Sequence, residues 1–188
     1  MSRLWFLILI ASFSCLAQAD FLDRRLGEIS AQTEMTAEFT DIWRAEYLDE
    51  DVVSHGKLYF KSPDLLIKEV ISPEPATYTV SGESVKVEQG ETVKHIQLSD
   101  HPELGMGIYA LRMLLQGNRK GLDRMFLYQF RHSDNSFESW VIELFPKSTY
   151  SKEKVRKIEV AGEKGELREV KVIYTSADVY ITRIKANE

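Results

Sequence analysis

The sequence predicts an α+β fold, in which an antiparallel sheet of about ten strands is accompanied by two main helices. Three observations support this prediction. Apolar and polar residues alternate with a period of two along most of the chain, short polar turns separate these runs, and an apolar segment at residues 102–117 has helix-type ends. Strands that follow one another through short turns pair antiparallel, and a sheet of this length is expected to curl on itself.

The N-terminal segment has the pattern of a secretory signal peptide. Arg3 supplies the positive charge, an apolar run extends from Leu4 to Leu16, and Ala17-Gln18-Ala19 offers small residues for cleavage after residue 19. Two alternatives stay open. In the first alternative to cleavage, the segment is retained as an anchor, although a membrane span needs about 20 apolar residues. In the second, it is lipidated at Cys15, although Phe13 is bulky where a lipoprotein signal has a small residue.

Composition argues against several classes of function. The chain has 188 residues, of which 28% are charged and 44% hydrophobic, so we expect residues 20–188 to form one globular domain. The single cysteine, Cys15, lies in the segment expected to be removed, which leaves no disulfide, thiolate nucleophile or cysteine metal ligand. Loss of Arg3 takes the net charge from −5 to −6, and an acidic chain is a poor partner for nucleic acid or anionic lipid surfaces.

The first element expected after the signal segment is a short amphipathic helix at residues 20–31. Leu22, Leu26 and Ile29 are spaced to share one helical face, and Asp20 suits the N-cap position.

A long strand is expected at residues 35–47, because apolar residues occupy nearly every second position. Asp41 interrupts this apolar face, which indicates that the strand bends there or lies near an edge of the sheet. The odd-numbered positions are Met35, Ala37, Phe39, Asp41, Trp43, Ala45 and Tyr47.

Shorter strands with similar patterning fill most of the remaining sequence. Gly82 and Gly90 mark two of the turns between them, and Pro146 ends a strand. The expected strands cover residues 57–61, 65–71, 76–80, 85–88, 93–98, 126–130, 137–146, 155–161, 167–175 and 179–185.

Residues 102–117 predict the main helix. Pro102 suits a first turn and Gly117-Asn118 suits a C-terminal cap. Apolar residues cover nearly the whole circumference, so this helix must be buried or must face apolar groups on both sides. A brief helical turn is expected to follow, ending near Arg124.

The sequence lacks the motifs of common enzyme and metal sites. There is no glycine-rich phosphate loop, no Gly-x-Ser-x-Gly and no pair of histidines at helical spacing. Glu143 falls opposite Trp140 and Ile142 in the strand alternation, so we expect it to face solvent. We therefore predict a protein that is not an enzyme and needs neither metal nor cofactor. The four histidines lie beside predicted turns: His55, His95, His101 and His132.

Two interpretations of the apolar strand face remain open. Its aromatic residues either form an ordinary core against the helices, or they line a hollow that a curled sheet with few helices cannot fill and that holds an apolar ligand. The second interpretation gives these lining residues: Met35, Phe39, Trp43, Leu58, Phe60, Leu65, Phe126, Tyr128, Trp140 and Ile142.

A family resemblance favours the hollow. The stretch "HGKLYFKSPDLLIKEVISPEP" resembles the periplasmic outer-membrane lipoprotein carriers, the LolA-like family, in its glycine, alternating strand, proline followed by an acidic residue, second apolar strand and final proline turn. Later pieces, "ALRMLLQGN", "SWVIELFPK" and "GELREVKV", are also similar to that family. The matching positions of the first motif are Gly56, Leu58, Phe60, Pro63, Asp64, Leu65 and Pro73.

The chain departs from the family pattern in ways that indicate a divergent member. Family carriers often have a basic residue before the first proline that helps to hold the lid, whereas this chain has Ser62. Ile67-Lys68 stands where an aromatic residue is usual, and Val85 and Val87 replace aromatic residues of a later strand pair.

The resemblance implies a half-open antiparallel β-barrel with helices forming a lid over an apolar cavity. It also implies a monomeric lipid-binding domain at residues 20–188 in a Gram-negative periplasm, which carries the acyl chains of a lipid or lipoprotein between an inner-membrane transporter and an outer-membrane acceptor. A sensor or interaction module that binds a membrane regulator is the alternative within the same family. The expected lid residues are Met106, Ile108, Leu111, Met113 and Leu114.

Overall fold

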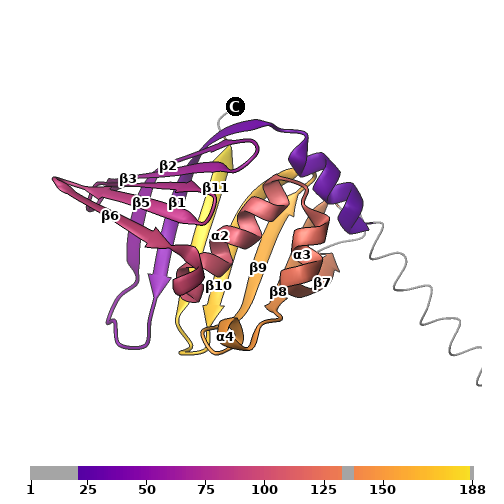
Figure 1. Cartoon of the computed structure of the whole chain (residues 1–188). Coiled ribbons are helices and arrows are strands. Elements are labelled where there is room, and N and C mark those ends of the chain that lie inside the picture. The colour runs from indigo at the N-terminus through magenta and orange to yellow at the C-terminus, as the bar shows by residue number, and fades with distance from the viewer. Residues whose placement is uncertain (1–20, 133–137, 187–188) are drawn as a thin grey trace, which may run out of the picture.

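The computed structural model describes residues 21–132 and 138–186 (Figure 1). In these residues eleven strands form a single sheet in the order β6-β5-β4-β3-β2-β1-β11-β10-β9-β8-β7, and every neighbouring pair is antiparallel. β6 and β7 are the two edges of this sheet, which is therefore open rather than closed. The prediction of an α+β fold with a half-open antiparallel sheet is confirmed.

The first half of the sheet is a meander of six strands joined by short turns. Their bounds are β1 Glu34–Arg44, β2 Val52–Lys61, β3 Leu65–Ser72, β4 Ala76–Ser81, β5 Ser84–Gln89 and β6 Thr92–Gln97. β2 begins five residues earlier than the periodicity predicts, because Val52 and Val53 continue the ladder with Trp43 and Ile42 of β1.

The second half contains the remaining strands and most of the helices. The strands are β7 Phe126–His132, β8 Ser139–Pro146, β9 Val155–Glu163, β10 Glu166–Tyr174 and β11 Val179–Ala186. The helices are the N-terminal helix at residues 21–30, the 3-10 turn η1 Leu98–Asp100, α2 Pro102–Leu115, α3 Arg119–Met125 and α4 Thr149–Lys152. The expected helices at residues 20–31 and 102–117 are therefore present, although the expected N-cap Asp20 lies outside the described residues.

Strand register divides the sheet into an inner face, which the helices cover, and an outer face. Met35 pairs with Phe60, and Phe60 pairs with Leu66, so these three side chains share the inner face. Leu65 pairs with Lys61 and therefore points to the outer face. The expectation that Leu65 lines the inner face is wrong, because three consecutive apolar residues in β3 carry no alternation from which its orientation could be read.

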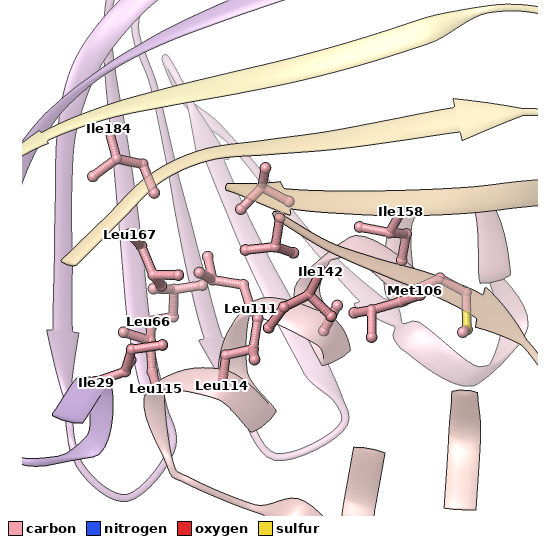
Figure 2. Packing of buried hydrophobic residues seen from close by; sticks show 14 of the residues in the cluster. Ile29, Leu66, Met106, Leu111, Leu114, Leu115, Ile142, Ile158, Leu167 and Ile184 are labelled. Carbon is pink, nitrogen blue, oxygen red and sulfur yellow. The ribbon is translucent and has the colours of Figure 1, made fainter. Parts of the chain in front are cut away.

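Helix α2 lies on the inner face across β9 and β10, and Figure 1 shows α3 and the N-terminal helix on the same side of the sheet. The three apolar residues of the N-terminal helix, Leu22, Leu26 and Ile29, are all buried in the common core. Figure 2 shows side chains of α2, among them Leu111 and Leu114, beside strand residues Ile142 and Leu167. None of the helices within residues 21–132 and 138–186 is long and apolar enough to cross a membrane.

Asp41 lies in the middle of the sheet and not at an edge. β1 is paired with β2 on one side and β11 on the other, and the side chain of Asp41 is buried on the inner face with 3% exposure. The expectation that Asp41 lies near an edge of the sheet is therefore wrong. Lys68 of β3 forms an ion pair with the buried carboxylate inside the sheet.

Glu143 is also buried, with 6% exposure, which corrects the expectation that it faces solvent. Arg131 of β7 and Lys157 of β9 both contact its Oε1 at 2.6 Å on the outer face. The apolar stems of these two long side chains shield the carboxylate, so the alternation identified its face correctly but not its burial.

Candidate functional site

The inner face of the sheet and helix α2 together form the candidate site. Met106, Leu111 and Leu114 of α2 are buried against strand residues such as Ile142 and Ile158 (Figure 2). Ile108 and Met113 are partly buried and pack against the same cluster. Every residue expected in the lid is therefore in contact with the apolar core or within it.

The residues expected to line the cavity mostly share this core. Met35 and Tyr128 are partly buried and pack against it, whereas Trp43 lies at the end of β1 with 42% exposure and Leu65 is on the other face. The fully buried members are Phe39, Leu58, Phe60, Phe126, Trp140 and Ile142.

With α2 in this position, helix side chains cover the apolar inner face of β9 and β10. Two pockets, of about 390 and 260 Å³, lie on the outer face, the first between Thr40, His55 and Arg183 and the second between Thr36, Tyr59 and Ile67. An apolar ligand on the inner face of β9 and β10 would take the place of the α2 side chains.

A small set of polar contacts fastens α2 to two turns of the first sheet half. Arg112 Nη1 donates to the carbonyl oxygen of Gly82 at 2.5 Å, and its Nη2 lies 3.7 Å from Asp64 Oδ2. The Gly82 N–H donates to the same Asp64 oxygen at 3.0 Å. Gly82 has a φ of +57°, which a residue without Cβ adopts readily. We call Asp64, Gly82 and Arg112 the latch.

Two further contacts flank the latch. The Tyr109 hydroxyl donates to Glu83 in the turn between β4 and β5, and Gln116 Nε2 donates to the carbonyl oxygen of Pro63 at 2.5 Å. Burial and the neighbouring Glu83 carboxylate raise the pKa of Tyr109, so its hydroxyl keeps its proton. The Pro63-Asp64 pair of the sequence motif is thus where the covering helix attaches.

The latch explains a departure noted in the sequence. Sequence comparison led us to expect a basic residue before Pro63, where this chain has Ser62, and the cation beside Asp64 is Arg112 of the helix. The sequence signal for this role was a positive charge on a mostly apolar helix, but its partners could not be identified without the structure.

Sequence reasoning missed a polar cluster on the inner face. Asp41 of β1 forms an ion pair with Lys68 of β3 and accepts hydrogen bonds from Tyr180 at 2.5 Å and Thr182 at 2.7 Å. Lys68 Nζ also lies 3.1 Å from the Tyr180 hydroxyl and 4.5 Å from the centre of the Phe39 ring. The isolated Asp41 on an apolar strand face was a signal of such a partner, and Lys68 was noted only as a departure from the family pattern.

The described part of the chain contains no group of three or more histidine, cysteine or acidic side chains that could hold a metal ion.

The fold and the site define a class: an open antiparallel half-barrel whose apolar inner face is covered by a helix that a few polar contacts hold in place. A family model described as outer membrane lipoprotein carrier protein LolA-like matches residues 14–186, so this chain belongs to that LolA-like family. Among curated proteins, none matches the chain.

Solved structures share the fold at low sequence identity. A putative outer membrane lipoprotein-sorting protein domain from Vibrio parahaemolyticus superposes with a TM-score of 0.51 at 10% identity, over 91% of this chain and 92% of that one. A DUF1329 family protein from Desulfovibrio piger also gives a TM-score of 0.51, at 9% identity, over 87% of this chain and 88% of that one. These similarities concern the fold.

Proposed function

We propose that this protein is a periplasmic carrier that takes up the acyl chains of a lipid or lipoprotein on the inner face of its sheet when α2 moves away. The observation that carries the proposal is the inner face itself, where apolar strand residues face an apolar helix held by few polar contacts. Membership of a family described by lipoprotein carriage supports it. The pattern of the N-terminal segment supports export.

The energetics of exchange support this proposal. Met106, Leu111, Leu114 and Leu115 of α2 are buried, and full burial of such a side chain contributes roughly 1.5–3 kcal/mol, or about 6–12 kcal/mol for the four. An acyl chain of about sixteen carbons contributes on the order of 12 kcal/mol by the same rule, at roughly 0.8 kcal/mol per CH₂. The ligand can therefore replace the helix at small net cost, as a carrier that must also release its cargo requires.

The latch limits the stability of the closed position. Arg112 Nε is buried without a hydrogen-bond partner among the described residues, which offsets part of the gain from the other contacts of this guanidinium. Met106 and Met113 of the helix are unbranched and adapt to apolar surfaces of different shape. Both features favour a helix that can leave the sheet and return.

The test is to lock α2 in place. The mature chain would contain no cysteine, so Glu83→Cys with Tyr109→Cys introduces a single reactive pair where the two side chains touch. A short bifunctional maleimide with a reducible centre then ties the helix to the turn. Uptake of a fluorescent fatty-acid methyl ester is expected to disappear on cross-linking and to return on reduction.

A matched control separates locking from modification. Thr77→Cys with Glu88→Cys places the same cross-link between neighbouring positions of β4 and β5, away from α2, and should leave uptake unchanged. If the locked protein binds the probe as well as the unlocked one, α2 is not a lid. If folded, unlocked protein shows no saturable uptake, the carrier proposal falls, and an interaction module that binds a membrane regulator becomes the better reading.

A further inference from the structure

The polar cluster on the inner face leaves one donor without a nitrogen or oxygen partner. The Asp41 carboxylate is fully engaged, because Lys68, Tyr180 and Thr182 all contact it. The Lys68 ammonium has three N–H donors, of which one faces Asp41 and another faces the Tyr180 hydroxyl oxygen. No third nitrogen or oxygen partner of Lys68 is present among the described residues, and its remaining side lies near the Phe39 ring.

A second donor lies beside Lys68. Tyr78 of β4 is the direct cross-strand neighbour of Lys68, so both side chains point to the inner face a short distance apart. Tyr78 is half-buried, and its hydroxyl has no hydrogen-bond partner within the part of the chain that the structure describes. An ammonium and a phenol therefore belong to neighbouring positions on the same apolar face, with the Lys68 Nζ directed toward Asp41 and Tyr180.

This end of the inner face is partly exposed. Trp43, two residues beyond Asp41 on the same side of β1, is 42% exposed, and the Lys68 side chain keeps 20% exposure. Helix α2 packs on β9 and β10, on the far side of β11 from this cluster. A ligand lying along the inner face would therefore pass Lys68 and Tyr78 at the exposed end of the sheet.

The charges decide which ligand group fits. Lys68 and Asp41 neutralise each other in a largely buried place, where burial lowers the pKa of Lys68 although the Asp41 charge opposes this. A second anion placed against Lys68 would lie close to the Asp41 carboxylate, which already contacts Lys68, Tyr180 and Thr182. An uncharged acceptor gains the free hydrogen bond without that repulsion.

We propose that Lys68 and Tyr78 form a polar subsite for the carbonyl oxygen of an ester- or amide-linked acyl lipid, and that the neighbouring Asp41 disfavours free carboxylates. This inference rests on the proposed carrier function and specifies the chemical class of its cargo. The acyl chain lies on the apolar part of the inner face, while the carbonyl group where it joins the headgroup receives the Lys68 and Tyr78 donors.

The experiment compares three probes with the same chain at about pH 8: methyl dodecanoate, dodecyl methyl ether, which lacks the carbonyl oxygen, and dodecanoate. Each displaces a fluorescent apolar reporter from the protein. We expect the ester to bind about tenfold more tightly than the ether, as for a hydrogen bond to a charged donor, and more tightly than the ionised acid.

Variants connect this preference to the cluster. In the double variant Asp41→Asn/Lys68→Met, which keeps the shapes and leaves no buried charge, the ester and ether should bind equally. Asp41→Asn alone leaves Lys68 without its counter-charge, so dodecanoate should now bind more tightly than the ester. Lys57→Met on the exposed outer face of β2 is the matched control and should keep the wild-type order of affinities.

The outcomes distinguish the two proposals. Equal binding of ester and ether by the wild-type protein would overturn the carbonyl subsite and leave the carrier function standing. Survival of the ester preference in the double variant would also overturn it. If none of the three probes displaces the reporter from folded protein, both the carrier function and the subsite are wrong.

Discussion

Arg112 of α2 donates a hydrogen bond of 2.5 Å to the carbonyl oxygen of Gly82, so the covering helix is fastened to the turn between β4 and β5. This bond joins two segments that lie 30 residues apart in the chain. It also joins the first half of the sheet, which carries the sequence motif, to the helix that covers the second half. Movement of α2 away from the sheet would therefore break this contact.

Removal of the latch should speed ligand uptake. Arg112→Met removes one charge-assisted hydrogen bond and the contact with Asp64, which favours the open position of α2. We expect uptake of a fluorescent fatty-acid methyl ester in stopped-flow measurements to be about tenfold faster, and the free energy of unfolding in urea to fall by about 1–3 kcal/mol.

Arg124→Met, at an exposed position of α3, is the control for loss of a positive charge and should change neither quantity appreciably. A variant at Arg112 that is less stable but takes up the probe at the wild-type rate would show that the latch serves stability alone.

The ion pairs on the outer face should make stability depend on pH. Burial raises the pKa of Glu159, but hydrogen bonds from Lys157 and Lys171 outweigh it and hold the pKa below its ordinary value of 4.5. The unfolded state then takes up the proton first, so the stabilisation is present above about pH 4.5 and is lost as the pH falls through the lower, folded-state pKa.

Urea unfolding between about pH 7 and pH 3 measures this contribution. Glu159→Gln should be less stable than wild type at neutral pH and should lose less stability on acidification. Glu46→Gln, in the exposed turn after β1, should follow the wild-type curve. Parallel curves for wild type and Glu159→Gln would contradict the assignment.

Two glycines should respond to alanine in opposite directions. A Cβ at Gly162 of β9 would lie 2.2 Å from Cζ2 of Trp140 and 2.4 Å from the carbonyl oxygen of Glu166. Trp140 cannot yield easily, because its Nε1 donates to the Lys164 carbonyl oxygen at 2.8 Å. Gly162→Ala is therefore expected to lower the free energy of unfolding by about 3 kcal/mol or more.

Gly27 lies within the N-terminal helix, and a Cβ there would meet no atom within 4 Å. Gly27→Ala should raise the free energy of unfolding by roughly 0.5–1 kcal/mol, since alanine loses less backbone entropy in a helix. Equal effects of the two substitutions in urea unfolding would argue against the packing of Trp140 described above.

The register of β3 predicts unequal costs at two adjacent leucines. Leu66 is buried on the inner face with Phe60, so Leu66→Ala should reduce the free energy of unfolding by about 2–5 kcal/mol. Leu65 lies half-buried on the outer face, and Leu65→Ala should cost less than about 1 kcal/mol. A larger loss at Leu65 than at Leu66 would show that the strand is shifted by one residue.

Local sequence patterns specify the individual strands, turns and helices of this protein. The period-two alternation through Phe39, the turns at Gly82 and Gly90 and the apolar helix after Pro102 all appear in the structure where the residues predict them. These features follow from backbone conformation and from the faces that neighbouring residues present, so nearby residues suffice to specify them. The resemblance to the LolA-like family predicted the open arrangement of the sheet.

Tertiary structure alone decided which face β3 turns inward and which residues meet across the sheet. The consecutive apolar residues Leu65 and Leu66 have no alternation to read, so only pairing with β2 assigns their sides. Asp41 accepts a hydrogen bond from Tyr180, which follows it by 139 residues, and no local pattern links two such positions. Side-chain periodicity is a short-range property, whereas the pairing of distant strands depends on the packing of the whole sheet.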